Sequence, residues 1–229
     1  MQYQDAADDA VVPAMPELPG AEQGQPLPHG FVYLDEALPG IEWDAAYAGS
    51  DNFTGAPVDG YGADRIAMAV EMVESLRLAS ELAGEAGYAL FVWDAARPQR
   101  AVDNFVRWAA ADEDGLTKER HYPNIDKRDM FSLGYVAKKS GHSRGAAIDL
   151  TLVDVETGEQ LDMGTIFDFM DVKSHHGAKG LTQDQTKNRK RLEAIMRKAG
   201  FKRYDNEWWH YILKDEPHPG MYFDFLIGH

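Results

Sequence analysis

The most informative stretch of the sequence is Ser140-Gly-His142-Ser-Arg-Gly-Ala-Ala-Ile-Asp149-Leu150. Its first half is a glycine-flanked loop that carries a histidine, and its second half belongs to an apolar run that predicts a buried strand over residues 146–153. Because side chains alternate along a strand, Asp149 points away from its neighbours Ile148 and Leu150. A carboxylate in so apolar a strand is costly unless it is paired or binds a metal. The alternative is that Asp149 lies on the exposed face of a half-buried strand, and the stretch alone fits both interpretations.

A second histidine lies in the aromatic stretch Glu207-Trp-Trp-His210-Tyr-Ile-Leu213. A lone histidine in such a strand more often packs in the core than binds a ligand. However, His142, Asp149 and His210 together supply two imidazoles and one carboxylate, an accepted ligand set for a catalytic zinc with one position open for water. Glu207 is then an acidic group that is not needed as a metal ligand, and it lies where a general base for the zinc-bound water is expected. On a continuous strand it would face away from His210, so we expect it in the turn before the strand or at a bulge.

A third motif, Trp93-Asp-Ala-Ala-Arg97-Pro98, ends a predicted strand over residues 88–93. An arginine at a strand-to-helix junction is, taken alone, more often a salt-bridge partner. Beside a zinc site, Arg97 becomes a candidate to stabilise the oxyanion of a tetrahedral intermediate.

Hydrophobic periodicity predicts the elements around these motifs. Helices come first and strands mostly later, without regular alternation, which indicates an α+β fold and not a doubly wound sheet. The expected elements are a helix capped by Asp64 and running to about Gly87, a helix beginning at Pro98, an irregular stretch over 112–139, a basic amphipathic helix over 184–199 closed by Gly200, and a hairpin of strands 201–204 and 208–213.

Composition limits the classes of function. The 229 residues fit one large domain of ordinary globular composition, and the absence of cysteine excludes disulfides, thiolate metal ligands and a thiol nucleophile. A formal net charge of −15 argues against nucleic acid or an anionic membrane as a partner. There is neither a secretory signal nor an apolar run of roughly 18 residues that could span a membrane. We therefore expect a cytoplasmic protein, or a periplasmic one if a signal peptide had been removed.

The negative charge is concentrated at the N-terminus. Residues 1–64 contain 12 acidic and no basic side chains, and residues 1–28 contain five prolines. Such a segment cannot bury enough apolar surface to order itself. We predict that residues 1–28 form a disordered extension, with a lid or a dimer strap as the alternative, and that residues 29–229 form the catalytic domain.

At these separations the motifs S-x-H-x-R-G-x-A-x-D-L, E-W-W-H and W-D-x-x-R-P resemble the D-alanyl-D-alanine dipeptidases of the VanX type. The resemblance runs from about Trp43 to Phe225 and includes segments outside the motifs: Asp51–Gly55, Pro57–Tyr61, Tyr122–Asp126, Phe167–Asp171, Ser174–His176, Asp215–Pro217 and Tyr222–Phe225. These enzymes belong to a wider group of zinc metallopeptidases that includes cell-wall carboxypeptidases and the hedgehog signalling domain. The resemblance implies that group's fold, a single domain with helices packed on a central, mostly antiparallel sheet.

The resemblance also implies an activity, the hydrolysis of D-Ala-D-Ala to two D-alanines by a zinc-bound water. The implied roles are one zinc per chain held by His142, Asp149 and His210; Glu207 as the base; Arg97, with the zinc, at the oxyanion; Asp168 and Tyr47 at the free amino group of the dipeptide; and Ser140 in a hydrogen bond to substrate. The family usually has Gly-Tyr where this chain has Ala95-Ala96, so we expect an altered pocket wall.

Two rival functions remain open at this point. A peptidoglycan D,D- or L,D-carboxypeptidase of the same wider group would need an open cleft where Tyr47 and Asp168 close one end. A non-catalytic zinc-stabilised binding domain would not need both Glu207 and Arg97. The expected partner is a small dipeptide, and the sequence leaves open a homodimer and the physiological role, which could be glycopeptide resistance, cell-wall turnover or nutrient use.

Two further patterns are expected to lie outside the site. His175-His176 are adjacent on one chain, and adjacent residues rarely bind one ion well, so a loop or supporting role is expected. The basic run Lys187–Arg191 is expected to be a solvated helix face.

Overall fold

The computed structural model describes residues 26–228, so the predicted extension over residues 1–28 lies almost wholly outside the described residues. The central sheet has the strand order β2-β4-β5-β7-β6, and all neighbours are antiparallel except β2 and β4. The expected α+β class with a mostly antiparallel sheet is therefore confirmed. The strands are β2 (Glu42–Trp43), β4 (Tyr88–Asp94), β5 (Ala147–Asp154), β6 (Phe201–Tyr204) and β7 (Glu207–Leu213), and a second sheet pairs β1 (Phe31–Tyr33) with β3 (Ala67–Ala69).

Two long helices cover one face of the central sheet. Apolar residues of α2 (Val73–Glu85) and α5 (Gln183–Lys198) pack on Ile148, Leu150 and Leu152 of β5 in the main core. Thr182 and Gln185 form a reciprocal capping box at the start of α5, which satisfies two helix-terminal donors. The helix ends before Gly200, whose φ of +97° suits the left-handed turn into β6.

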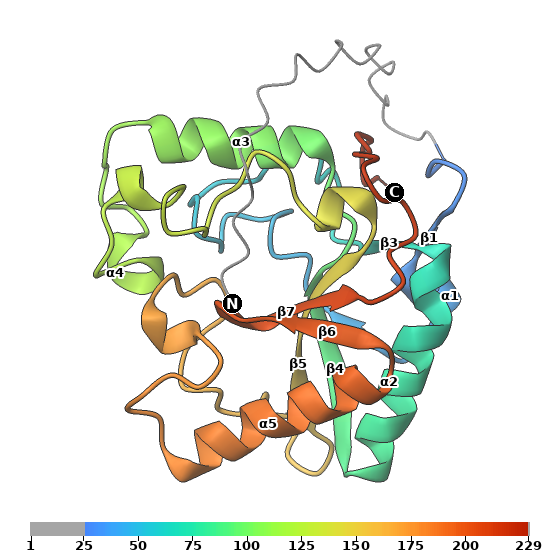
Figure 1. The fold of residues 1–229 in the computed structure, drawn as a ribbon. Helices are drawn as coiled ribbons and strands as arrows, with labels where there is room; N and C mark the ends of the chain where they lie inside the picture. The colour runs from blue at the N-terminus through green and yellow to red at the C-terminus, as the bar shows by residue number, and fades with distance from the viewer. Residues whose placement is uncertain (1–25, 229) are drawn as a thin grey trace.

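The opposite face of the sheet carries α3 (Gln99–Ala110) and most of the loops, around a second cluster of aromatic side chains that includes Tyr47, Phe53 and Phe105. Figure 1 shows α3 at the top of the molecule and α5 at the bottom, with the sheet between them. The short elements are α1 (Leu34–Ala37), α4 (Lys118–His121) and the 3-10 turns η1 (Val70–Met72), η2 (Lys127–Asp129), η3 (His142–Arg144) and η4 (Val172–Ser174). None of the helices in the described part of the chain is long and apolar enough to cross a membrane.

The predicted helix from Asp64 to Gly87 is wrong at its beginning. The helix starts at Val73, and Ala67–Ala69 instead form strand β3 against β1. Small apolar residues are compatible with either conformation, and the distant partner strand decides between them. The carboxylate of Asp64 accepts a hydrogen bond from the backbone of Ala45, at 2.9 Å, and caps no helix.

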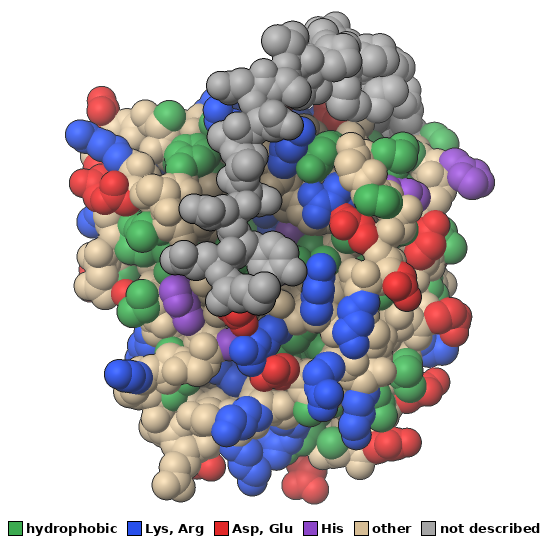
Figure 2. Space-filling view, in the orientation of Figure 1, with side chains coloured by type: hydrophobic (Ala, Val, Ile, Leu, Met, Phe, Trp, Pro, Cys, Tyr) green, Lys and Arg blue, Asp and Glu red, His purple; other side chains and the backbone are tan. Residues whose placement is uncertain are grey.

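The basic run Lys187–Arg191 is only partly solvated. Figure 2 shows Lys and Arg side chains gathered over the region of α5 and β6. Lys187 and Lys190 of α5 are exposed. Arg189, however, is 3% exposed and donates hydrogen bonds to the backbone carbonyls of Met163, Lys173 and His175. It thereby fastens two interior parts of the loop between β5 and α5.

Candidate active site

Three side chains from separate elements converge on one point. His142 comes from η3, Asp149 from β5, and His210 from the position on β7 that pairs with Asp149. The Nε2 atom of His142 lies 3.1 Å from Nδ1 of His210, and the Asp149 carboxylate oxygens lie 2.9 Å from His210 Nδ1 and 3.2 Å from His142 Nε2. Ligand atoms around a tetrahedral zinc with bonds of about 2.0–2.1 Å are about 3.3 Å apart. The donor types and their spacing therefore fit a zinc ion.

The backbone around His142 fixes the orientation of its ring. Its Nδ1 lies 2.7 Å from the carbonyl oxygen of Ala95, which accepts the Nδ1 proton and leaves Nε2 free as a ligand atom. Gly145 makes the turn from η3 into β5 with a φ of +69°, and a Cβ atom there would lie 2.9 Å from that of Ala69. Gly145 thus permits both the turn from η3 into β5 and the close packing of this turn against β3.

A buried carboxylate outside the predicted site residues supports the ligands. Asp94, 1% exposed, accepts hydrogen bonds from Tyr61 Oη at 2.6 Å and from Arg97 Nε at 2.9 Å. Arg97 Nη2 also lies 3.3 Å from Asp149 Oδ2. The signal for Asp94 was present in the W-D-x-x-R motif, where it precedes the arginine by three residues, but only the fold shows that it orients Arg97.

Asp149 is ionised in these surroundings. Burial alone would raise the pKa of its carboxyl, but the imidazoles of His142 and His210 outweigh burial and hold that pKa far below its usual range. A permanently charged carboxylate is what a divalent cation requires from its ligand.

Glu207 lies beside the ligands without belonging to them. It begins β7, where the pairing with β6 shifts register between Arg203 and Tyr204, so the expected irregularity is confirmed. Its Oε2 atom lies 3.8 Å from Nδ1 of His210. Burial, followed by the negative charges of Asp149 and Asp168, raises the pKa of Glu207 well above its usual value. A cation held by the three ligands would oppose this shift and return the carboxyl toward the ionised form.

Asp168 has a strained backbone conformation and a buried carboxyl group. It is the single non-glycine residue with positive φ, +55°, in the described part of the chain, and it is 6% exposed. Tyr47 donates a hydrogen bond to its Oδ2 at 2.8 Å, and His121 Nδ1 lies 3.1 Å from its backbone oxygen. Burial and the charge of Asp149 raise the pKa of Asp168 to about 8. A strained, buried carboxyl that the surroundings hold in place is typical of a functional position.

All eight residues proposed from the sequence line one cavity of about 240 Å³. The cavity is smaller than most sites for drug-sized ligands, which begin at about 300 Å³. Ala95 and Ala96 are not among its lining residues, so neither side chain forms part of the wall, and the effect of these alanines on the pocket stays a prediction. Ala95 acts through its backbone carbonyl. His175 lies outside the ligand cluster, where its Nε2 is 3.0 Å from the hydroxyl of Tyr135 at the cavity wall.

Comparisons with known proteins agree on one family. A family model described as D-ala-D-ala dipeptidase matches residues 28–227. The chain is 57% identical over 198 residues to a D-alanyl-D-alanine dipeptidase of Enterococcus faecium, covering 86% of this chain and 98% of that protein. It is 53% identical over 198 residues to one of Streptomyces coelicolor, with the same coverage, and 52% identical over 202 residues to one of Enterococcus faecalis, covering 88% of this chain and all of that protein.

Proposed function

The chain belongs to the D-Ala-D-Ala dipeptidase family of peptidases, and on this premise we propose that it hydrolyses D-Ala-D-Ala to two D-alanines in a zinc-dependent reaction. The observation that carries the proposal is the convergence of His142, Asp149 and His210 in one small cavity with Glu207 and Asp168. A zinc ion held by the three ligands would polarise the scissile carbonyl and the attacking water.

Glu207 serves as general base and then as general acid. Its carboxylate removes one proton from the attacking water while the water oxygen forms a bond to the peptide carbon. The carboxyl then delivers that proton to the peptide nitrogen as the carbon–nitrogen bond breaks. Its place beside His210, but outside the ligand set, suits this exchange.

Arg97 stabilises the negative charge that develops on the carbonyl oxygen. Asp94 and Asp149 hold its Nε and Nη2 atoms, so the guanidinium is oriented before substrate arrives. Because a preorganised donor does not have to reorient as charge develops, its effect appears mainly in the transition state.

Asp168 and Tyr47 select a free amino group. In the metal-free protein, burial and the charge of Asp149 raise the pKa of Asp168 to about 8, so its carboxyl is readily protonated until a positive charge arrives. An arriving ammonium favours the ionised form and pairs with it. An acylated dipeptide or a longer peptide has no ammonium at this position and would leave the buried carboxyl without its partner, which favours a dipeptidase over a carboxypeptidase.

The test is release of D-alanine from D-Ala-D-Ala, L-Ala-L-Ala, N-acetyl-D-Ala-D-Ala and a pentapeptide that ends in D-Ala-D-Ala, each with and without a chelator. We expect hydrolysis of D-Ala-D-Ala alone, lost with chelator and restored by zinc. Efficient hydrolysis of the pentapeptide or of the acetylated dipeptide would favour the carboxypeptidase. No hydrolysis of any substrate by the zinc-loaded protein would favour the non-catalytic binding domain.

A further inference from the structure

The turn over residues 140–146 brings Ser140 and His142 to the cavity wall and leads into β5. The Oγ atom of Ser140 accepts a hydrogen bond from the backbone N–H of His142 at 3.2 Å. A serine hydroxyl also has one proton to donate, and no acceptor within residues 26–228 receives it. Because Ser140 lines the cavity and keeps this proton free, its side chain is suited to donate a hydrogen bond to a dipeptide.

Arg144 connects this turn to the C-terminal segment, residues 214–228, which follows β7. Its Nε atom pairs with Glu216, and its Nη1 atom donates to Tyr222 Oη at 3.2 Å and to the carbonyl oxygen of Ser140 at 3.5 Å. In the described part of the chain no other donor reaches that carbonyl oxygen. Glu216 and Tyr222 therefore hold the backbone of Ser140 through the Arg144 guanidinium.

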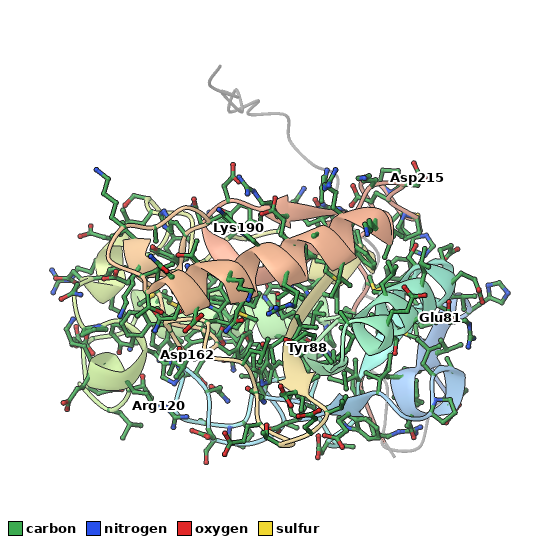
Figure 3. The ribbon with its side chains drawn as sticks, turned by 90° about the horizontal axis from the view of Figure 1, so that it is seen from below. Glu81, Tyr88, Arg120, Asp162, Lys190 and Asp215 are labelled. Atoms are coloured by element: carbon green, nitrogen blue, oxygen red, sulfur yellow. The ribbon has the colours of Figure 1, made fainter. Side chains whose placement is uncertain are left out.

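The backbone of the C-terminal segment joins the turn to the beginning of α3. The N–H of Phe223 donates to the carbonyl oxygen of Ser143 at 2.8 Å, and the Phe223 carbonyl accepts from the N–H of Gln99 at 2.9 Å. The Gln99 side chain in turn donates to the carbonyl oxygen of Lys138 at 3.1 Å, just before the turn. Figure 3 shows Asp215, near the beginning of the segment, beside the end of α5 that leads into β6. No residue of the segment lines the cavity, so it supports the turn from outside.

The metal ligand of the turn has a separate support. The ring of His142 is fixed by the contact between its Nδ1 atom and the carbonyl oxygen of Ala95, at 2.7 Å, which does not involve Arg144. Loss of the Arg144 contacts should therefore leave the zinc ligand in place and displace the Ser140 backbone. Such a displacement weakens substrate binding, because a hydrogen bond depends steeply on its distance and angle.

We propose that Arg144 is a positioning residue for substrate: held by Glu216 and Tyr222, it fixes the Ser140 carbonyl so that the Ser140 hydroxyl donates to the bound dipeptide. The inference rests on the proposed dipeptidase function. It assigns the C-terminal segment a role in substrate binding, while the zinc ligands and the chemical step depend on other contacts.

The experiment measures dipeptide binding and turnover in variants of the zinc-loaded protein. Calorimetry gives the Kd of D-Ala-D-Ala in a Glu207→Ala background, where hydrolysis is suppressed. We expect Arg144→Met to raise this Kd about tenfold, the effect of losing one hydrogen bond. With Glu207 intact, Arg144→Met should raise KM by a similar factor, keep kcat within about threefold and retain its zinc, because only binding is affected.

Arg65→Met is the matched control. The Arg65 side chain is 19% exposed, against 21% for Arg144, and it pairs with Asp35 and Glu36 without lining the cavity. Both substitutions should lower the melting temperature by similar amounts, but only Arg144→Met should weaken dipeptide binding. Equal Kd values in the two variants would make the Arg144 ion pair an ordinary structural contact and overturn the proposal.

A double-mutant cycle tests whether Arg144 acts through Ser140. Ser140→Ala removes the donor, so adding Arg144→Met should change the Kd by less than about twofold more. Fully additive effects would refute the proposal. Tyr222→Phe, which removes a single oxygen, is the milder variant if Arg144→Met does not fold, and it should raise the Kd about threefold. An unchanged Kd in Tyr222→Phe would also count against the proposal.

The two readouts separate this inference from the proposed hydrolysis. Dipeptide binding that depends on Arg144, without hydrolysis by the parent protein, would contradict the proposed function and support the positioning role. Normal hydrolysis by the parent, with an unchanged Kd in Arg144→Met, would contradict the positioning role alone.

Discussion

Strand β5 presents Ile148, Leu150 and Leu152 to the helices on one face and Asp149 and Thr151 to the opposite face, where Asp149 lines the cavity, and none of the five is more than 2% exposed. The two faces are thus equally buried but carry opposite chemistry. On the helix face burial is favourable by itself, because apolar surface leaves water. On the cavity face burial is unfavourable until a charge or hydrogen-bond partner arrives. We therefore expect helix-face substitutions to change the free energy of unfolding and cavity-face substitutions to change binding and catalysis.

The largest effect on the cavity face is expected for His210→Ala. Removing one of three ligands should eliminate tight zinc binding, and with it almost all hydrolysis, while the apoprotein stays folded. Elemental analysis of the purified variant against the parent, which should carry about one zinc per chain, measures this. His175→Ala is the matched control and should keep its zinc, since His175 lies outside the ligand cluster. Unchanged zinc content in His210→Ala would refute the ligand assignment.

Glu207→Ala should slow the chemical step without changing the zinc content. We expect kcat to fall by roughly 10²- to 10⁴-fold, as for a removed general acid–base group, while KM changes much less. Zinc content should stay at the parental level, because His142, Asp149 and His210 supply the ligands. Loss of zinc would make Glu207 a ligand, and a near-normal kcat would make it a structural residue.

Leu150→Ala tests the helix face. Removing a fully buried leucine side chain should lower the free energy of unfolding by about 2–5 kcal/mol, through lost apolar burial and the cavity left behind. The remaining folded molecules should keep a normal kcat. Thr151→Val, the next residue on the opposite face, is the control and should change stability little. A kcat that falls with Leu150→Ala in proportion to stability would show that the two faces are not separable.

Asp168→Asn should change substrate binding and the dependence of stability on pH. Loss of the charged partner should raise KM for D-Ala-D-Ala by roughly 10- to 100-fold and weaken discrimination against the acetylated dipeptide. In the metal-free protein, Asp168 has a pKa of about 8 when folded and an ordinary value of 3.8 when unfolded. Between these values the folded state holds a proton that the unfolded state has lost, so this group makes stability fall as pH rises from about 4 to about 8.

Denaturant unfolding of the metal-free protein at pH 5 and at pH 8 measures that dependence. The parent should lose on the order of a few kcal/mol more than Asp168→Asn over this interval. An identical slope in the two proteins would mean that Asp168 is ionised throughout.

The smallest effect on activity is expected for a deletion that touches neither face of β5, the removal of residues 1–25. Leu27 packs on the second cluster of aromatic side chains, and the carbonyl of Pro28 accepts a hydrogen bond from the backbone of Phe31 at 3.1 Å, so a cut after residue 25 leaves these contacts in place. Dipeptidase activity should stay within a few-fold of the parent, measured on D-Ala-D-Ala with the fold checked by circular dichroism. A large loss would assign the extension the role of a lid or strap.

The sequence by itself determined the elements whose signal is local. The apolar run of β5 and the aromatic stretch of β7 predicted their strands, and the helix over 184–199 was found within one residue at each end. The residue types of His142, Asp149 and His210, with the family resemblance, indicated a metal set because donor chemistry is a property of the side chain alone. Asp168 and Tyr47 were proposed from the resemblance only, because their neighbours in sequence give no sign that they meet.

Tertiary structure alone decided what depends on distant partners. Ala67–Ala69 became a strand because β1 lies alongside, Arg189 became buried because three loop carbonyls surround its guanidinium, and Asp94 became a support for Arg97 because Tyr61 closes over it. The cavity around the candidate ligands forms only between segments far apart in the chain. Local periodicity reports which side chains avoid water, whereas pairing, charge balance and cavities depend on which segments meet, and that is set by packing of the whole chain.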